Sequence, residues 1–194
     1  MDRLQPKETE IPGGALMRRM ERKMMLRKIF FVASLLSSFA YAQQPPVNSP
    51  LLDHLAGHWV LKGTIAGQQV THDMDSEWTL DHHYLRIHEV SRENNNQGKP
   101  KYDALIFVAW NEQPKQYACV WLDIYGGLAA ESIGVATPKE NEIPFVFKDE
   151  KGSVSVTNDM LYTPSTDTWE WRIDNIDKGA ITPFARVRLT RAEH

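Results

Sequence analysis

The chain has 194 residues, with 22 Lys and Arg against 25 Asp and Glu, and a formal net charge of −3 at pH 7. This length is enough for one domain with a proper hydrophobic core. The single cysteine, Cys119, excludes an intrachain disulfide.

A segment near the N-terminus has the pattern of an export signal. Arg27 and Lys28 precede an apolar run over residues 29–39, and residues 40–42 are the small-x-small pattern Ala-Tyr-Ala that a signal peptidase cuts after. The apolar run is too short to span a bilayer, and no second run of spanning length follows. We therefore expect a periplasmic or secreted protein without a membrane segment in its mature form; a buried core helix is the alternative reading.

The expected leader covers residues 1–42, and cleavage would leave Gln43 as the mature N-terminus. We interpret residues 1–23 as a mis-assigned extension before a true start at Met24 or Met25, the alternative being a basic cytoplasmic tail. Removing the leader would take away eight Lys/Arg and four Asp/Glu, which leaves 14 basic and 21 acidic side chains and a net charge of −7. Such an acidic domain, without clustered Lys or Arg, repels nucleic acid and anionic lipid.

Residues 43–50 are a Gln/Pro/Asn/Ser linker, and residues 51–194 form the expected domain. Residues 51–55 can form one helical turn that lids one end of the fold. Ten segments rich in Val, Ile, Thr and aromatic residues then follow, with Gly, Pro, Asn and Asp between them. These expected strands are 58–65, 70–80, 83–92, 102–110, 116–123, 131–137, 143–148, 153–162, 168–175 and 184–190. Short strands at this spacing predict an all-β fold, a single antiparallel barrel of about eight to ten strands.

One hairpin can be registered from its turn. A two-residue turn at 81–82 places Trp78 opposite Leu85, and Ser76 opposite Ile87, on a face that should look at the core. The other face then carries two opposite-charge pairs, Glu77 with Arg86 and Asp75 with His88. A one-residue slip would bring apolar and charged side chains together, so the pattern supports this register.

Two Pro-containing turns carry an aromatic residue on each side, seven positions apart: Trp110 and Tyr117 around the first, Tyr162 and Trp169 around the second. Both predict hairpins in which the two rings pack across the strand pair.

Gly57-His58-Trp59 near the first strand resembles the Gly-x-Trp start of lipocalin-like (calycin) barrels. The segments 84–89, 120–123 and 169–171 are similar to a secreted bacterial branch of that superfamily of unknown function, and the resemblance covers residues 51–191. It implies an antiparallel barrel with an internal cavity and with Trp59 packed at the closed end.

The same resemblance implies a likeness in fold to the haem-binding nitrobindin-like barrels. They use a longer Gly-x-Trp-x-Gly-x-Gly start and a histidine near the C-terminal strand as the iron ligand. Here residues 57–63 depart from that start, and no histidine occurs between His88 and His194. Haem binding is therefore not carried over, and no cofactor is expected.

Four histidines crowd the registered hairpin, His72, His82, His83 and His88, with aspartates nearby. Such side chains can bind zinc. In the register above, however, His72 and His88 point to opposite faces and the other two lie at the turn, so we expect polar surface residues and no metal site.

Asp123 follows Trp121 at strand spacing, beside a Gly-Gly loop. If that side is the interior, Asp123 is expected to be a buried carboxylate at a cavity mouth, and such a group needs a partner, for which Arg186 is the candidate. An alternative function is a barrel enzyme that uses Asp123, His88 and Arg186 in a pocket. No catalytic motif of recognised spacing supports an enzyme. Cys119 lies in an apolar run and is expected to be a buried, inert thiol.

The favoured function is a binder of a small, largely apolar ligand in the barrel interior; the other alternative is a ligand-free protein-interaction module. An open interior of roughly a few hundred Å³ would favour the binder, and a filled one the interaction module. The expected ligand-binding residues are Trp78, Leu85, Ile87, Tyr117, Trp121, Asp123, Trp171 and Arg186.

Overall fold

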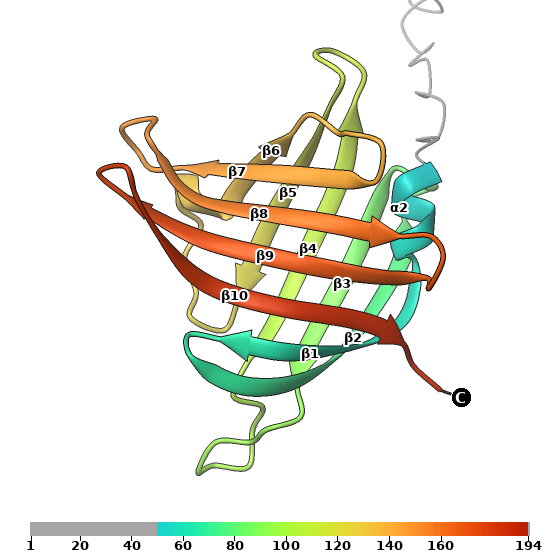
Figure 1. Cartoon of the computed structure of the whole chain (residues 1–194), viewed down its shortest axis with the longest axis vertical. Coiled ribbons are helices and arrows are strands. Elements are labelled where there is room, and N and C mark those ends of the chain that lie inside the picture. Colours follow the sequence, from blue (N-terminus) through green and yellow to red (C-terminus); the bar gives the residue numbers. More distant parts are fainter. Residues whose placement is uncertain (1–49, 194) are drawn as a thin grey trace, which may run out of the picture. The chain divides into compact units, whose positions relative to one another are not determined.

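The computed structural model describes residues 50–193 (Figure 1). The expected leader, residues 1–42, and nearly all of the expected linker lie outside the described residues, so both stay predictions.

The described residues form one short α-helix, one 3-10 turn and ten strands. Their bounds are α2 Pro50–Leu55, β1 Gly57–Ile65, β2 Gln68–Thr79, β3 Tyr84–Ser91, β4 Asp103–Asn111, β5 Gln116–Asp123, η1 Ala130–Ser132, β6 Ile133–Ala136, β7 Glu142–Lys148, β8 Val154–Thr163, β9 Thr168–Asp177 and β10 Ala180–Arg191. Each expected strand overlaps one of these ten, and the expected helical turn is α2. Among the described residues no helix has the length and hydropathy to cross a membrane.

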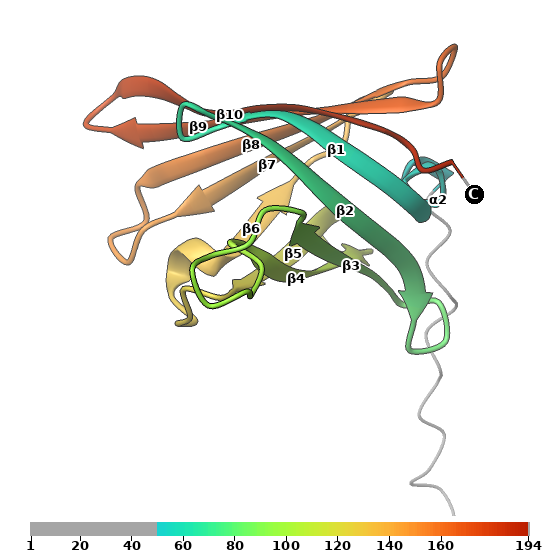
Figure 2. The same ribbon diagram turned by 90° about the horizontal axis from the view of Figure 1, so that it is seen from below.

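Each strand pairs antiparallel with its neighbours in the chain, and β1 pairs with β10, which closes the barrel. Figure 2 shows β1 and β2 joining the β7–β10 side of the barrel to the β3–β6 side. The predicted fold class, a single antiparallel barrel that is almost entirely β, is confirmed.

Alternating burial along the strands defines the interior. In β3 every second residue is buried, starting with Leu85 and Ile87, while Arg86 and His88 face outward. The β2–β3 register is the expected one, with Trp78 opposite Leu85 and Ser76 opposite Ile87. The predicted apolar face is therefore the inner wall of the barrel.

The outer face of this hairpin carries exposed ion pairs. Arg86 donates to Glu77 at 2.5 Å, as the register predicts. Asp75 lies opposite His88 but pairs with His58 of β1. Exposed pairs of this kind each contribute about 0–1 kcal/mol to stability.

Both predicted aromatic hairpins are present. Trp110 lies opposite Tyr117 with the rings edge to face at 5.1 Å between centroids. Tyr162 lies opposite Trp169 with a centroid distance of 5.0 Å. These contacts fix β4 to β5 and β8 to β9 beside their turns.

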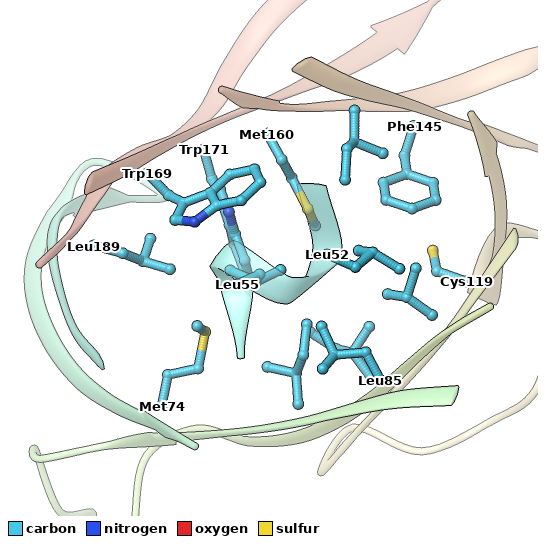
Figure 3. Close-up of a cluster of buried hydrophobic side chains, with 14 of the residues drawn as sticks. Leu52, Leu55, Met74, Leu85, Cys119, Phe145, Met160, Trp169, Trp171 and Leu189 are labelled. Carbon is cyan, nitrogen blue, oxygen red and sulfur yellow. The ribbon is translucent and has the colours of Figure 1, made fainter. Parts of the chain in front are cut away.

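Helix α2 closes one end of the barrel. Its Leu52 and Leu55 are fully buried and point into the ring of core side chains contributed by the strands (Figure 3). A six-residue helix has little intrinsic stability, so this burial of two leucines is what holds it in place.

Trp59 joins α2 to β1 and is 1% exposed, as predicted for the closed end. Its Nε1–H donates to the carbonyl of Leu55 at 2.8 Å, and the Arg191 guanidinium lies 3.8 Å above its ring. Gly57 has φ +117°, and a Cβ there would come within 2.5 Å of Arg191 Nη1. This is the physical reason for the Gly-x-Trp sequence.

Candidate functional site

The barrel encloses a cavity of about 750 Å³ at the end away from α2. In an up-and-down meander the connections alternate between the two ends, so those after β1, β3 and β5 lie together. Ala66, Glu93, Lys101 and Tyr125 from these connections border the cavity. Figure 1 shows the β1–β2 turn at the end far from α2. The volume is in the range of small-molecule sites, roughly 300–1,000 Å³.

Aromatic and aliphatic side chains line the deeper part of this cavity. Trp121 of β5 and Trp171 of β9 meet edge to face, with centroids 6.1 Å apart. Phe147, Val156 and Val187 extend the apolar wall. Such a surface favours a flat apolar ligand. The ring of the ligand can pack against these side chains without burying a polar group of its own that lacks a partner.

A buried polar pair interrupts the apolar wall. His72 of β2 is 3% exposed and Glu89 of β3 is 2% exposed, and His72 Nδ1 lies 2.6 Å from Glu89 Oε1. Both side chains line the cavity. A carboxylate only accepts, so Nδ1 carries the hydrogen and the ring atom left for another partner is Nε2.

Tyr102 connects this pair to the aromatic wall. Its ring stacks on His72 at 5.6 Å between centroids, and its hydroxyl oxygen accepts a hydrogen bond of 2.8 Å from Trp121 Nε1. Burial, helped by the negative charge of Glu89, raises the pKa of Tyr102 far above its ordinary value. The phenol therefore stays protonated and can offer its own O–H to a ligand.

The charged side chains around the cavity are mostly acidic. The described lining residues include four carboxylates, on Glu89, Glu93, Asp123 and Glu131. Against these four, Lys101 is the one lysine or arginine among the described lining residues. An anionic ligand would meet like charges inside a region of low dielectric. The cavity is therefore better matched to a neutral or cationic molecule.

Asp123 lines the cavity at its mouth, but it is half-buried and not buried as expected. Its Oδ1 accepts the backbone N–H of Tyr125 at 2.9 Å, which fixes the start of the β5–β6 loop. The expected partner was wrong: Arg186 faces outward from β10 and pairs with Asp174 at 2.5 Å. Its neighbours Ala185 and Val187 face inward instead, in phase with the buried Leu189.

The eight expected ligand-binding residues fall into three groups. Trp121, Asp123 and Trp171 line the cavity. Leu85, Ile87 and Tyr117 do not line the cavity, contrary to expectation, because they are buried in the packed core with Leu52 and Leu55 of α2. Trp78 and Arg186 lie away from the cavity, which corrects the expectation that they line it. Whether the first group binds a ligand stays a prediction.

Trp78 belongs to the closed end. Its Nε1–H donates to Asp53 of α2 at 2.9 Å, and its ring stacks on His82 at 4.0 Å. Trp78 shares the inner face with Leu85, but it sits beside the β2–β3 turn, at the opposite end of the barrel from the mouth.

His88 also lies outside the cavity, half-exposed, with Nε2 2.9 Å from Asp103. The three residues of the alternative enzyme, Asp123, His88 and Arg186, therefore share no pocket, and that expectation was wrong. His72 and His88 do point to opposite faces, as the register predicted. Within residues 50–193 no group of three His, Cys, Asp or Glu is placed to hold a metal ion.

Cys119 is 1% exposed, as predicted, and burial raises the pKa of its thiol to about 12. A thiol with so little thiolate is a poor nucleophile. Its side chain packs in the core cluster.

The site residues predicted from the sequence did not include several polar residues of the cavity, among them His72, Glu89, Tyr102 and Asn158. A signal for two of them was present. His72 is in phase with Ser76 and Trp78, and Glu89 is in phase with Leu85 and Ile87, so the predicted register already placed both on the inner face.

No protein-family model matches this chain, and none of the curated proteins compared with it matches either.

Proposed function

We propose that this protein binds a small, largely apolar ligand that is neutral or cationic, inside the barrel. The observation that carries the proposal is the cavity of about 750 Å³, with Trp121 and Trp171 on its wall and the His72–Glu89 pair within it. A cavity of mostly apolar lining with a few placed polar groups is the usual form of a small-molecule site.

The alternatives fit less well. A ligand-free interaction module is expected to have an interior filled by side chains, as small closed barrels do. This barrel instead contains the cavity of about 750 Å³. An enzyme built on Asp123, His88 and Arg186 would need the three side chains to meet in one pocket. They do not meet, because His88 and Arg186 face outward.

A lipocalin-like (calycin) relationship and export to the periplasm or beyond belong to the same proposal. The closed ten-stranded meander is compatible with that fold, and Gly57 and Trp59 act together at the closed end. Export rests on the pattern of residues 24–42. Together they describe an extracytoplasmic carrier or binding protein.

An uncharged dye that fluoresces in dry surroundings, N-phenyl-1-naphthylamine, should bind the native protein. Trp121→Ala should weaken that binding by about tenfold or more, because the variant removes an aromatic wall of the cavity. Fluorescence titration measures the effect, and circular dichroism checks that the barrel remains folded.

Trp110→Ala is the matched control for this titration. Trp110 is a partly buried tryptophan beside the β4–β5 turn and does not line the cavity. It should leave dye binding unchanged. If the native protein binds no dye, or if both variants lose binding equally, the interior is not the binding site.

Export predicts a mature N-terminus at Gln43. Protein taken from the periplasmic fraction of an expressing bacterium should have the mass of residues 43–194. Ala40→Leu together with Ala42→Leu should block this cleavage, because the peptidase needs small side chains there. An intact leader on unsubstituted protein in that fraction would contradict the prediction.

A further inference from the structure

Asn158 is a buried amide without a protein partner. It lies on the inner face of β8, opposite Phe145 of β7 and Ile173 of β9, and is 1% exposed. Neither its Nδ2 nor its Oδ1 has a hydrogen-bond partner among the described residues, and the side chain lines the cavity.

A second unpaired donor lies close by. Trp171 is 1% exposed, lines the same cavity, and its Nε1–H also has no partner among the described residues. It is opposite Met160, two residues along from the Asn158–Ile173 pair. Such diagonal neighbours on one face of a sheet are about 7–8 Å apart.

Ser76 Oγ and Arg86 Nε are also buried without a partner among the described residues, but neither residue lines the cavity, whereas Asn158 and Trp171 do. Buried polar atoms in proteins are nearly always hydrogen-bonded, because an unpaired amide loses its hydration without compensation. A ligand that supplies both an acceptor and a donor would satisfy Asn158, and its acceptor would also satisfy Trp171, since one carbonyl oxygen has two lone pairs.

The surroundings restrict the ligand further. The edge-to-face pair of Trp121 and Trp171 favours a flat ring. Negative charge in the lining disfavours an anion. The described lining residues carry four carboxylates, on Glu89, Glu93, Asp123 and Glu131, and Lys101 is the one lysine or arginine among them. A phosphorylated or carboxylated molecule is therefore a poor match.

We propose that Asn158 recognises a flat, uncharged heterocycle with an N–H and a C=O side by side, the edge of a lactam. The ring N–H donates to Asn158 Oδ1, and the ring carbonyl accepts from Asn158 Nδ2 and from Trp171 Nε1. This inference rests on the proposed binding function and names the head group of its ligand.

Three molecules with the same two-ring shape test the proposal by displacing N-phenyl-1-naphthylamine from the full chain. They are 2-quinolinone, which carries the lactam edge, naphthalene, which has no polar group, and 2-naphthoate, which is anionic. We expect 2-quinolinone to bind about tenfold more tightly than naphthalene, although naphthalene is more hydrophobic, and 2-naphthoate to bind most weakly.

Asn158→Leu should abolish this preference, with 2-quinolinone losing about tenfold and naphthalene losing nothing. Thr157→Val, one residue earlier on the outer face of β8, is the matched control and should keep the preference. The ranking of the three molecules on the unsubstituted protein remains decisive even if Asn158→Leu does not fold.

Equal binding of 2-quinolinone and naphthalene would overturn the lactam proposal while the carrier function stands, since water alone would then satisfy Asn158. Tightest binding by 2-naphthoate would overturn it as well. Failure of the dye and of all three molecules to bind would overturn the proposed function itself.

Discussion

Replacing Trp59 with Ala should lower the free energy of unfolding by about 3–5 kcal/mol, the usual cost of truncating a large core aromatic. Trp59 is 1% exposed and links three parts of the closed end. The variant would leave a cavity under α2, remove the donor to Leu55 O and remove the ring beneath Arg191. Urea denaturation followed by circular dichroism measures the loss.

Tyr125→Ala is the control for this measurement. Tyr125 is an aromatic residue of the mouth that is 78% exposed, so its removal should change stability by less than about 0.5 kcal/mol. A loss below about 1 kcal/mol for Trp59→Ala would mean that α2 does not depend on Trp59, and the structural account of the Gly-x-Trp start would fail.

The strands could be predicted because their sequence preferences are local. Val, Ile and aromatic residues between turn residues located all ten. The predicted β2–β3 register is also the observed one, although residues 80–83 form a four-residue connection in place of the predicted two-residue turn. The start of β10 was placed at 184, but the strand begins at Ala180. Pro183 was the reason: proline interrupts strand patterns, and here the pairing with β9 shifts register between Pro183 and Ala185.

The sequence predicted which face of the sheet a side chain lies on more reliably than it predicted the position of that side chain along the barrel axis. Leu85, Ile87 and Trp78 were correctly assigned to the inner face, yet the first two lie in packed core and Trp78 contacts α2. Depth depends on which end of the barrel the helix closes and on how far the opposite walls stand apart. Neither is encoded within one hairpin.

Arg186 shows a different kind of failure. Strict alternation along Ala185, Arg186 and Val187 places the arginine on the outer face, whereas the expected pairing with Asp123 requires that carboxylate to be buried. In the structure Asp123 is only half-buried and caps a turn, so it has no need of a buried cation. Strand alternation therefore predicts the position of Arg186 better than the need of a carboxylate for a partner does.

The largest effect at the candidate site is expected from breaking the His72–Glu89 pair. Glu89→Leu would leave the Nδ1–H of a fully enclosed imidazole without its acceptor, and His72→Phe would leave a buried carboxylate without its donor. Each single variant should lower the free energy of unfolding by about 3–5 kcal/mol, as for other buried pairs that lose one partner.

The double variant, His72→Phe with Glu89→Leu, should recover most of that loss, because no unpaired polar group then remains and apolar side chains fill the space. The difference between the double variant and the sum of the single variants, measured by urea denaturation, gives the coupling energy of the pair. Losses below about 1 kcal/mol in both single variants would show that water from the cavity replaces the missing partner. A double variant as stable as the unsubstituted protein would mean that the intact pair contributes little net stability. Dye binding that survives in the double variant would mean that the aromatic wall of Trp121 and Trp171 provides most of the affinity.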